Sequence, residues 1–577
     1  MVFELSDKDA AAHPNPYMTV DVKVEFRSPR IRTLAVPAYW DGGRRLVVRF
    51  SPTEVGEWEY HVSGNIADWA DKTGSFTAAS SDSRGFIRPA NQHHWAYTER
   101  DSKGLDQAHL WMGATEMLLA TLDDAAFHAV ADARAAQNFN HLRMLVLSQE
   151  QAGAFASPEA PSIEYFQRLD QRIRYLNQKG ITADLVLAGG AGYLTNAFPT
   201  SQQRSRFIRF LVGRYAAMNV TWQGVDAFED YPDSRGLLKE VGVLLKQLDT
   251  YQHPRTAGAH LTSTPLLDDG WMSFAAYGTP DDNLGSVEHQ LYAVPFVNLE
   301  FGREDSGAGK SGPNDVDAAE FRRRLWNATM DGQYPTYANT GAGAKYANSP
   351  GAKAMTVWFD FFADTRHWEL EPYFDVDGGR AVALEDTEYV VYVEKPGPVE
   401  LTVEKHSYDV YWIDPADGES GSKKKLKFSG EHFTGEPPSR AHDWVLHLVR
   451  EGHLESMNKS FRFESRDIVL QEVEANTPKV PFVMEQPTGD LSLSKPTPYS
   501  AKLTRESRAT RLMRWLWMGE VAADHQGYKV LATSQKGMMQ PPRSLATNFP
   551  ALMHLRLYGM NANGKVYELD SACQVNP

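Results

Sequence analysis

The hydrophobic and polar positions change their period twice along the chain. Between residues 2 and 79 apolar residues alternate with polar ones in several short runs, as in Val22, Val24 and Phe26. This period of two is that of a half-buried β-strand. Gly42 and Gly43 mark a turn between two such runs. Short strands separated by turns predict a β-sandwich over residues 1–80.

After residue 85 short apolar runs alternate with amphipathic segments that carry helix start signals, such as Asp123, Ser162 and Asp233. Eight strands are predicted, at residues 110–114, 142–147, 183–187, 220–225, 256–260, 274–277, 296–299 and 354–359. Eight strands alternating with helices predict a closed (β/α)8 TIM barrel over residues 85–382. An open, doubly wound sheet is the alternative.

From residue 383 the strand pattern returns. Alternating runs at residues 389–393, 399–403, 407–413 and 442–450 predict a further β-sandwich over residues 383–455. Residues 456–577 are predicted to form a C-terminal β-rich domain. The predicted fold is therefore multidomain, α/β plus all-β, with a TIM barrel between N-terminal and C-terminal β-sandwich domains. A length of 577 residues suits three to four domains.

Composition excludes several classes of function. A formal net charge of −15 argues against a nucleic-acid-binding surface, which needs clustered Lys and Arg. The single cysteine, Cys573, allows no disulfide within the chain and no Cys-rich zinc motif. No apolar run reaches the roughly 18 residues of a membrane span. We therefore expect no nucleic-acid partner and no membrane span.

Carboxylates follow two of the predicted barrel strands. Catalytic groups of TIM barrels lie at the carboxyl ends of the strands. Glu300 follows the seventh strand and suits a nucleophile, although it could instead pair with Arg303 or Arg143. The fourth strand is followed by three carboxylates: Asp226, Glu229 and Asp230. Glycoside hydrolysis normally needs two carboxylates across the scissile bond, so these residues are the catalytic candidates.

Other polar and aromatic residues near the predicted strand ends are candidates for binding substrate. They are Glu116, Arg143, His260, His289 and Trp358. A metal site receives little support, because His93 and His94 are neighbours and adjacent strand residues point to opposite faces. The chain also lacks the His-Glu-x-x-His motif of zinc peptidases. We therefore expect no metal and no cofactor.

Several separate motifs resemble a known domain plan. Residues 15–17 (NPY), 37–42 (PAYWDG), 48–52 (VRFSP) and 56–60 (GEWEY) are similar to the β-sandwich that precedes many bacterial barrel glycosidases. The barrel resembles the apiosidase-like glycoside hydrolases and is similar in layout to the retaining enzymes of clan A. Residues 411–415 (YWIDP) are similar to the sandwich that follows such barrels. The resemblance covers about residues 2–450.

The resemblance implies that Glu300 is the nucleophile of a retaining mechanism. Relatives carry the acid/base carboxylate a fixed distance after a tryptophan, and counting from Trp222 places it on Ala227. Three explanations are open: the residue was removed by engineering, the loop shifts so that another carboxylate serves, or the barrel is catalytically altered. Glu229, and after it Asp226, are the replacements expected from a shifted loop.

The sequence therefore predicts an enzyme that cleaves a glycosidic bond in an oligosaccharide, polysaccharide or glycoconjugate. One alternative is a non-catalytic carbohydrate-binding barrel, and a weaker one is a polysaccharide lyase or isomerase. The expected partner is a carbohydrate substrate, and the oligomeric state is open. Because the domain plan resembles exported polysaccharide-processing proteins, we expect an extracellular or periplasmic protein of bacterial origin whose leader peptide has been removed.

Overall fold

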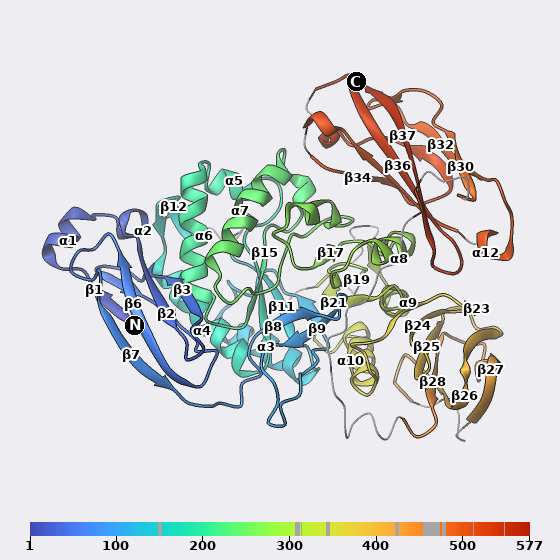
Figure 1. Ribbon diagram of the computed structural model, residues 1–577, viewed down its shortest axis with the longest axis horizontal. Helices are drawn as coiled ribbons and strands as arrows, with labels where there is room; N and C mark the ends of the chain where they lie inside the picture. The colour runs from blue at the N-terminus through green and yellow to red at the C-terminus, as the bar shows by residue number, and fades with distance from the viewer. Residues whose placement is uncertain are drawn as a thin grey trace.

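The structure is a computed structural model of the 577-residue chain. It describes residues 1–147, 153–305, 312, 314–341, 347–419, 421, 426–453, 474–475, 480–511, 513–524, 526–546 and 548–577. Figure 1 shows a central barrel with β-rich parts on both sides of it. The predicted fold class is confirmed.

The N-terminal part consists of two small sheets and two short helices, α1 (Asp7–Ala12) and α2 (Pro16–Thr19). One sheet has the order β3-β2-β6-β7 and the other β1-β5-β4. Their strands are β1 (Val2–Glu4), β2 (Val22–Arg27), β3 (Thr33–Pro37), β4 (Tyr39–Trp40), β5 (Arg45–Val47), β6 (Gly56–Gly64) and β7 (Thr73–Ala78). The alternating residues of β2 are buried and form a core with Trp58 and Trp69. The alternation of apolar and polar residues therefore corresponds to the buried and exposed faces of the N-terminal sheets.

A hairpin of β8 (Ile87–Ala90) and β9 (His94–Tyr97) leads into the barrel. The barrel strands are all parallel and pair in the order β16-β15-β14-β11-β10-β21-β18-β17. They are β10 (Gly113–Thr115), β11 (His141–Leu145), β14 (Thr182–Val186), β15 (Val220–Gln223), β16 (Arg255–Thr256), β17 (Ala275–Tyr277), β18 (Phe296–Asn298) and β21 (Gln333–Asn339). Between β16 and β17 the barrel is joined by Ser273, whose N–H donates to the Arg255 carbonyl at 2.9 Å.

Helices alternate with these strands, as predicted. They are α3 (Asp124–Ala136), α4 (Ile163–Gln178), α5 (Tyr193–Ala197), α6 (Ser201–Tyr215), α7 (Ser234–Leu248), α8 (Asp282–Leu291), α9 (Ala318–Met330) and α10 (Pro350–Ala363). Asp123, Ser162 and Asp233 cap the first N–H groups of α3, α4 and α7, which confirms these start signals. The loops contain short 3-10 helices at Phe228–Asp230 and Thr264–Asp269. They also contain the short strands β12 (Phe155–Ser157), β13 (Ala160–Pro161), β19 (Arg303–Glu304) and β20 (Asp315–Val316).

The prediction of the eighth strand was wrong. Residues 354–359 lie within α10, which Ser349 caps and which Pro350 begins at its first position. The run is rich in aromatic residues that also favour strands, so its composition was misleading. The eighth strand is β21, which contains Pro335. A proline argues against a strand between two neighbours, and this hid β21 from the sequence analysis.

Two β-rich parts follow the barrel. The first is a seven-stranded antiparallel sheet of β22 (Glu371–Tyr373), β23 (Val376–Asp377), β24 (Arg380–Leu384), β25 (Glu388–Val393), β26 (Val399–Ile413), β27 (Leu426–Gly435) and β28 (Trp444–Arg450). The predicted start of the last domain, residue 456, falls outside the described residues. The second part, the C-terminal sandwich, contains β29 (Glu474–Ala475), β30 (Phe482–Gln486), β31 (Leu491–Ser492), β32 (Thr497–Leu503), α12 (Arg508–Arg511), β33 (Arg514–Glu520), β34 (Lys529–Ala532), β35 (Lys536–Met539), β36 (Ala551–Met560) and β37 (Val566–Asn576).

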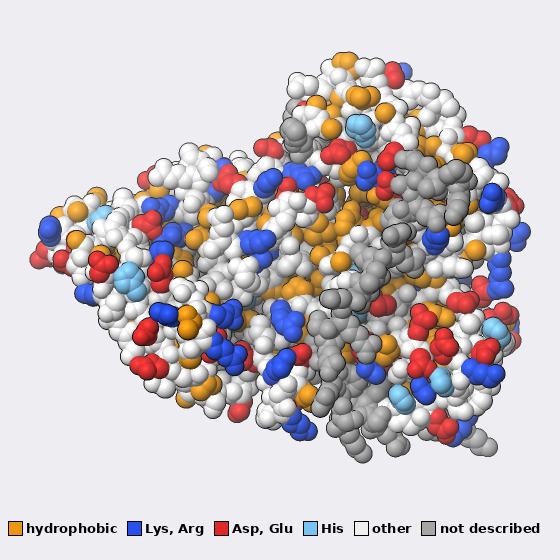
Figure 2. All heavy atoms as spheres, viewed as in Figure 1, with side chains coloured by type: hydrophobic (Ala, Val, Ile, Leu, Met, Phe, Trp, Pro, Cys, Tyr) orange, Lys and Arg blue, Asp and Glu red, His pale blue; other side chains and the backbone are white. Residues whose placement is uncertain are grey.

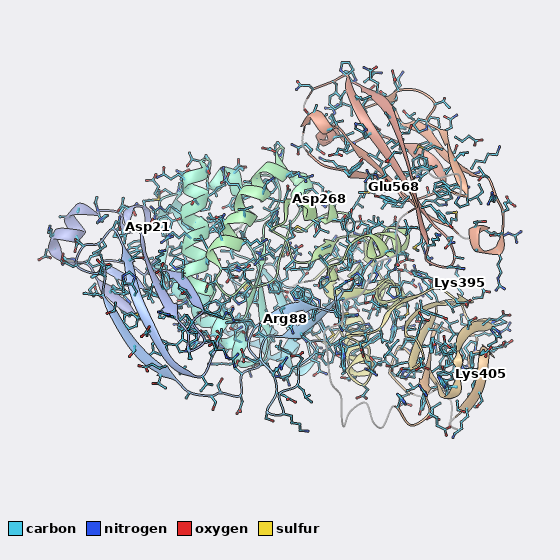
Figure 3. The ribbon with its side chains drawn as sticks, viewed as in Figure 1. Asp21, Arg88, Asp268, Lys395, Lys405 and Glu568 are labelled. Carbon is cyan, nitrogen blue, oxygen red and sulfur yellow. The ribbon has the colours of Figure 1, made fainter. Side chains whose placement is uncertain are left out.

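The C-terminal sandwich packs on the barrel through apolar side chains. Tyr277, Val287 and Phe296 of the barrel form one buried cluster with Leu516 and Met560 of the sandwich. Figure 3 labels Asp268 on the barrel side of this contact and Glu568 on the sandwich side. The last β-rich part is therefore fixed beside the barrel loops rather than joined by a linker alone.

The visible face in Figure 2 carries acidic and basic side chains interspersed over its described residues. Hydrophobic side chains gather near the centre of that face.

Among the described residues, no helix is long and apolar enough to cross a membrane.

Candidate active site

Glu300 lies two residues beyond the end of β18, the seventh barrel strand. Its N–H donates to the Asn298 side chain at 3.1 Å, which fixes the backbone at the strand end. Its carboxylate accepts a long hydrogen bond of 3.4 Å from Asn314 and lies 3.7 Å from Arg303. The side chain is 41% exposed. Glu300 is therefore an accessible carboxylate with weak partners, as an attacking group requires.

Glu304, four residues further on, has the opposite environment. It is 1% exposed and accepts hydrogen bonds from the Tyr337 hydroxyl at 2.8 Å, the Ser349 hydroxyl at 2.5 Å and the Gly351 N–H at 2.7 Å. These donors come from β21 and from the start of α10. Glu304 therefore joins two elements of the barrel, and it has no free side toward a substrate.

The fourth strand, β15, ends beside Arg143 of β11. Arg143 donates from Nε to the Gln223 side chain at 2.7 Å and from Nη2 to Asp226 at 2.5 Å. Asp226 is thus committed to an ion pair across three barrel strands. Arg143 therefore turns toward β15, so the alternative in which Arg143 pairs with Glu300 is not the arrangement found.

Glu229 lies in the short 3-10 helix Phe228–Asp230 that follows β15. Both of its carboxylate oxygens lie 3.1 Å from the backbone N–H of His260, which follows β16. Burial raises the pKa of Glu229, although hydrogen bonds from backbone N–H groups and the charge of His260 oppose this shift. A carboxyl with a raised pKa holds its proton to higher pH, which suits a proton donor.

Asp230 of the strand-four loop contacts His260, which follows strand five. The His260 ring and the Asp230 carboxylate lie 2.8 Å apart. Burial alone would lower the pKa of His260, but the hydrogen bond to Asp230 and the charges of Glu229 and Asp226 outweigh it and raise that pKa. His260 is exposed, so it can reach a substrate as well as Asp230.

The C-terminal sandwich also reaches this loop. Burial lowers the pKa of Lys529, at the start of β34, to about 8, and the nearby negative charge of Glu229 partly offsets that effect. The Lys529 ammonium donates to the Ser544 carbonyl. Lys529 is not among the residues predicted from the sequence, since nothing local indicates that it lies near a residue 300 positions earlier in the chain.

Two of the predicted substrate-binding residues have structural partners in the described residues, and a third lies away from the strand ends. Glu116 accepts two hydrogen bonds from Arg134 of α3, at 3.0 and 3.1 Å. Trp358 is buried within α10 and donates to the Thr329 hydroxyl at 2.9 Å, so it does not end a barrel strand. His289 lies in the last turn of α8, which returns to the amino end of the barrel, and it is remote from Glu300. The structure therefore places Trp358 and His289 away from the strand ends on which their predicted roles in binding substrate rested.

Two clefts in the described residues are not lined by Glu300. One, of about 1190 Å³, lies between the N-terminal sandwich and residues such as Asn177 and Asn219, which precede β14 and β15. It is therefore at the amino end of the barrel, and the carboxylates after β15 and β18 lie at the other. A cleft of about 690 Å³ between Asp233 of the barrel and Gln526 of the C-terminal sandwich borders the loop that contains Glu229. These carboxylates, at the carboxyl ends of the strands, therefore define the candidate active site.

Comparisons with known proteins agree with this architecture. Residues 102–367 match the catalytic domain of the apiosidase-like family, and residues 1–65 match a domain of unknown function, DUF5060. The barrel resembles the apiosidase-like catalytic domain. The predicted family resemblance is thereby confirmed.

Solved structures show the same fold at low sequence identity. A candidate glycoside hydrolase from Bacteroides vulgatus is 18% identical, with a TM-score of 0.67 over 78% of this chain and 98% of that one. A family 5 glycoside hydrolase from the same species is 15% identical, with a TM-score of 0.54 over 67% of this chain and 97% of that one. No curated protein matches the chain significantly. The fold is therefore that of glycoside hydrolases.

Proposed function

We propose that this protein is a glycoside hydrolase that uses Glu300 and Glu229 as its two catalytic carboxyl groups. One observation supports this most: the loops after strands four and seven of a glycoside-hydrolase-like barrel offer one accessible carboxylate and one half-buried carboxyl with a raised pKa. Retaining hydrolysis needs this pair of environments, one group ionised and the other protonated.

In the proposed mechanism, the Glu300 carboxylate attacks the anomeric carbon and forms a glycosyl ester. Glu229 transfers its proton to the glycosidic oxygen as that bond breaks, and the aglycone leaves as a neutral alcohol. Glu229, now ionised, then removes a proton from water as the water attacks the ester. Glu300 is released as a carboxylate and Glu229 is protonated again. Retention requires carboxyl groups about 5–5.5 Å apart when substrate is bound.

Glu229→Gln should lower kcat/KM by roughly 10²–10³-fold for glycosides with alkyl or sugar leaving groups, because these need a proton as they depart. Nitrophenyl glycosides, whose leaving groups depart without a proton, should lose much less in the first step. In the parent protein, activity should fall as pH rises through the raised pKa of Glu229, and the variant should lack this limb. The measurement is kcat/KM against pH for a matched pair of substrates.

His260→Asn is the matched control, because it removes the ring partner of Asp230 and keeps the backbone N–H that contacts Glu229. His260→Asn should keep the parent's ratio of kcat/KM between the two kinds of substrate. Equal losses for both substrates in Glu229→Gln, with an unchanged pH profile, would rule out Glu229 as the proton donor.

A second candidate function is non-catalytic carbohydrate binding, which is favoured by the alanine at position 227. The two functions are separated by screening aryl glycosides and oligosaccharides on the parent chain and on Ala227→Glu. Ala227 is 6% exposed, so a glutamate there has little room, and Glu229 already offers a proton. We expect cleavage by the parent and less than about a twofold gain in the variant. Cleavage by the variant alone would contradict the proposal and favour a barrel that lost its acid/base at Ala227.

A further inference from the structure

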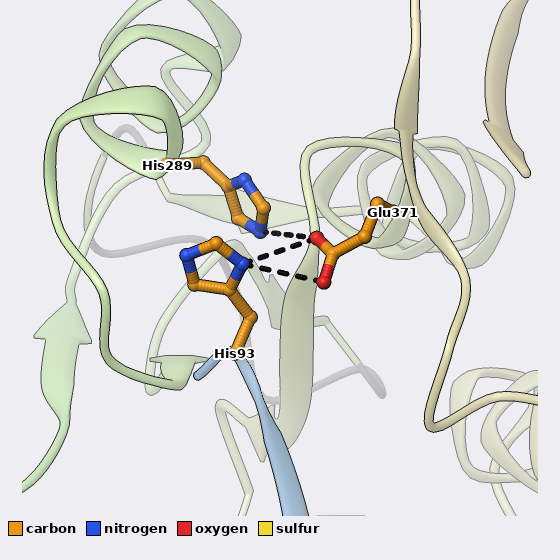
Figure 4. Close-up of side chains that lie close together, drawn as sticks. All are labelled: His93, His289 and Glu371. Atoms are coloured by element: carbon orange, nitrogen blue, oxygen red, sulfur yellow. Dashed lines mark hydrogen bonds and ion pairs between the residues drawn. The ribbon is translucent and has the colours of Figure 1, made fainter. Parts of the chain in front are cut away.

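A second group of ionisable side chains lies at the amino end of the barrel, away from the proposed active site. It consists of His93 before β9, His289 in the last turn of α8 and Glu371 at the start of β22 (Figure 4). Each offers one ligand atom, and these three atoms lie within 4.8 Å of one another. The hairpin, the barrel helix and the seven-stranded sheet therefore meet at this cluster.

The hydrogen bonds of His93 leave an unshared lone pair directed at Glu371. Its Nε2 lies 2.9 Å from the Tyr292 carbonyl oxygen, which can only accept, so Nε2 carries a proton. In the neutral ring Nδ1 then has a lone pair, and it lies 3.1 and 3.3 Å from the two carboxylate oxygens of Glu371. Two acceptors cannot bond to each other. Either a second proton or a cation must lie between them.

His289 adds a second nitrogen that lacks a hydrogen-bond partner among the described residues. Its side chain is 2% exposed, and neither ring nitrogen makes a hydrogen bond there. Nε2 faces the Glu371 carboxylate at 3.4 Å (Figure 4). A neutral imidazole with an unused lone pair is the form that binds a metal ion.

The surrounding groups are those that support a metal site. A ligating histidine usually donates its other N–H to a carbonyl, as His93 does to Tyr292. A ligating carboxylate is usually hydrogen-bonded, and Glu371 contacts His94 Nε2 at 3.1 Å, while His94 Nδ1 lies 2.8 Å from the Tyr334 hydroxyl. His93 precedes the strand and lies in the turn after Asn91 and Gln92, which have positive φ. Both neighbouring histidines can therefore face Glu371, contrary to the expectation from strand geometry.

We propose that His93 Nδ1, His289 Nε2 and the Glu371 carboxylate bind one Zn²⁺ ion that has a structural role. Two imidazoles and one carboxylate are a recurring zinc ligand set, and bonds of about 2.0–2.1 Å in a tetrahedron place ligand atoms about 3.3 Å apart. The separations of 3.1 and 3.4 Å from Glu371 fit this spacing. Glu371 is 26% exposed, so water can supply the fourth ligand. The ion would join the barrel to the seven-stranded sheet.

The test uses the full chain without a histidine tag, treated with a chelator and then equilibrated with two equivalents of ZnCl₂. After gel filtration, mass spectrometry of the elements should find about one zinc per chain. Zinc should also raise Tm by about 3 °C or more, since it binds the folded state. Co²⁺ in place of zinc should give the visible absorption bands of a four- or five-coordinate site, which requires no variant.

His289→Gln should retain less than about 0.2 zinc per chain and show no rise in Tm. The matched control is His447→Gln, which removes a buried histidine 2.6 Å from the buried Glu388, a pair for which the described residues offer no third ligand. This control should still bind one zinc. Parent protein with less than about 0.2 zinc and no change in Tm would overturn the proposal and leave a protonated ion pair. Zinc retained by His289→Gln at the parent level would also overturn it. Neither readout depends on the proposed hydrolase activity.

Discussion

Glu300→Gln should lower kcat/KM at least about 10³-fold for any glycoside that the protein cleaves, a loss of about 4 kcal/mol in transition-state stabilisation. The amide cannot attack the anomeric carbon, so no glycosyl ester forms. Tm should change by less than about 2 °C, because the side chain is 41% exposed and, among the described residues, its contacts with Asn314 and Arg303 are long. The measurements are initial rates on the best substrate of the screen and thermal unfolding of both proteins.

Glu304→Gln is the matched control within the same loop. Glu304 accepts three hydrogen bonds in the buried interior, and an amide nitrogen cannot accept any of them. This variant should therefore lose stability, by about 2 kcal/mol, and keep its turnover per folded molecule. Loss of Glu300 should therefore reduce activity but not stability, whereas loss of Glu304 should reduce stability but not activity.

A truncated variant separates attack from mere positioning. Glu300→Gly leaves space for a small external nucleophile, so added azide should restore turnover and yield a glycosyl azide. Near-normal activity of Glu300→Gln, or no azide product from the Glu300→Gly variant of an active parent, would remove Glu300 from the mechanism. In the first case the acid/base role of Glu229 is decided by its own leaving-group test, which is independent.

The barrel was predictable because its evidence is local. Helix caps such as Asp123 and Ser162 and the alternation of apolar strands with amphipathic helices are read from neighbouring residues. The same local evidence failed where two signals competed. Pro335 hid a true strand, and the aromatic run of α10 imitated one. Tertiary pairing of β21 with β10 and β18 overrides the missing N–H of a single residue.

The candidate site was predictable only as far as strand ends. The sequence predicted that Glu300 follows the seventh strand, and in the structure it follows β18. Contacts between distant segments were beyond the sequence. Three contacts depend on how the barrel strands and the domains pack. Arg143 turns toward Asp226, and Lys529 lies near Glu229. His93 meets Glu371, which is 278 residues away in the chain. The sequence likewise does not show that His93 lies in a turn, where it and His94 can both face Glu371.

Arg214→Met should lower the free energy of unfolding by about 3–5 kcal/mol, because it leaves a buried charge without its main partner. Arg214 is 0% exposed and lies in α6. It donates to both oxygens of Asp170 in α4, at 2.7 and 2.9 Å, and to Asp41 of the N-terminal sandwich at 3.0 Å. Arg49 of the sandwich also bonds to Asp170 and donates to the Arg214 carbonyl at 2.7 Å. Arg214 therefore joins the sandwich to the barrel.

Arg204→Met is the matched control, because Arg204 lies in the same helix and forms the same two-pronged pair, at 2.9 and 2.7 Å from Glu240. Glu240 is 33% exposed, so its charge stays solvated when Arg204 is removed. The control should cost about 1 kcal/mol or less. Urea unfolding of both variants, followed by tryptophan fluorescence and by circular dichroism, gives the comparison. Equal midpoints would show that the Arg214 network contributes no more than a surface pair. We expect a large loss of unfolding free energy in Arg214→Met alone. Because Arg214 lies between two domains, the N-terminal sandwich of this variant should also become accessible to protease early in unfolding.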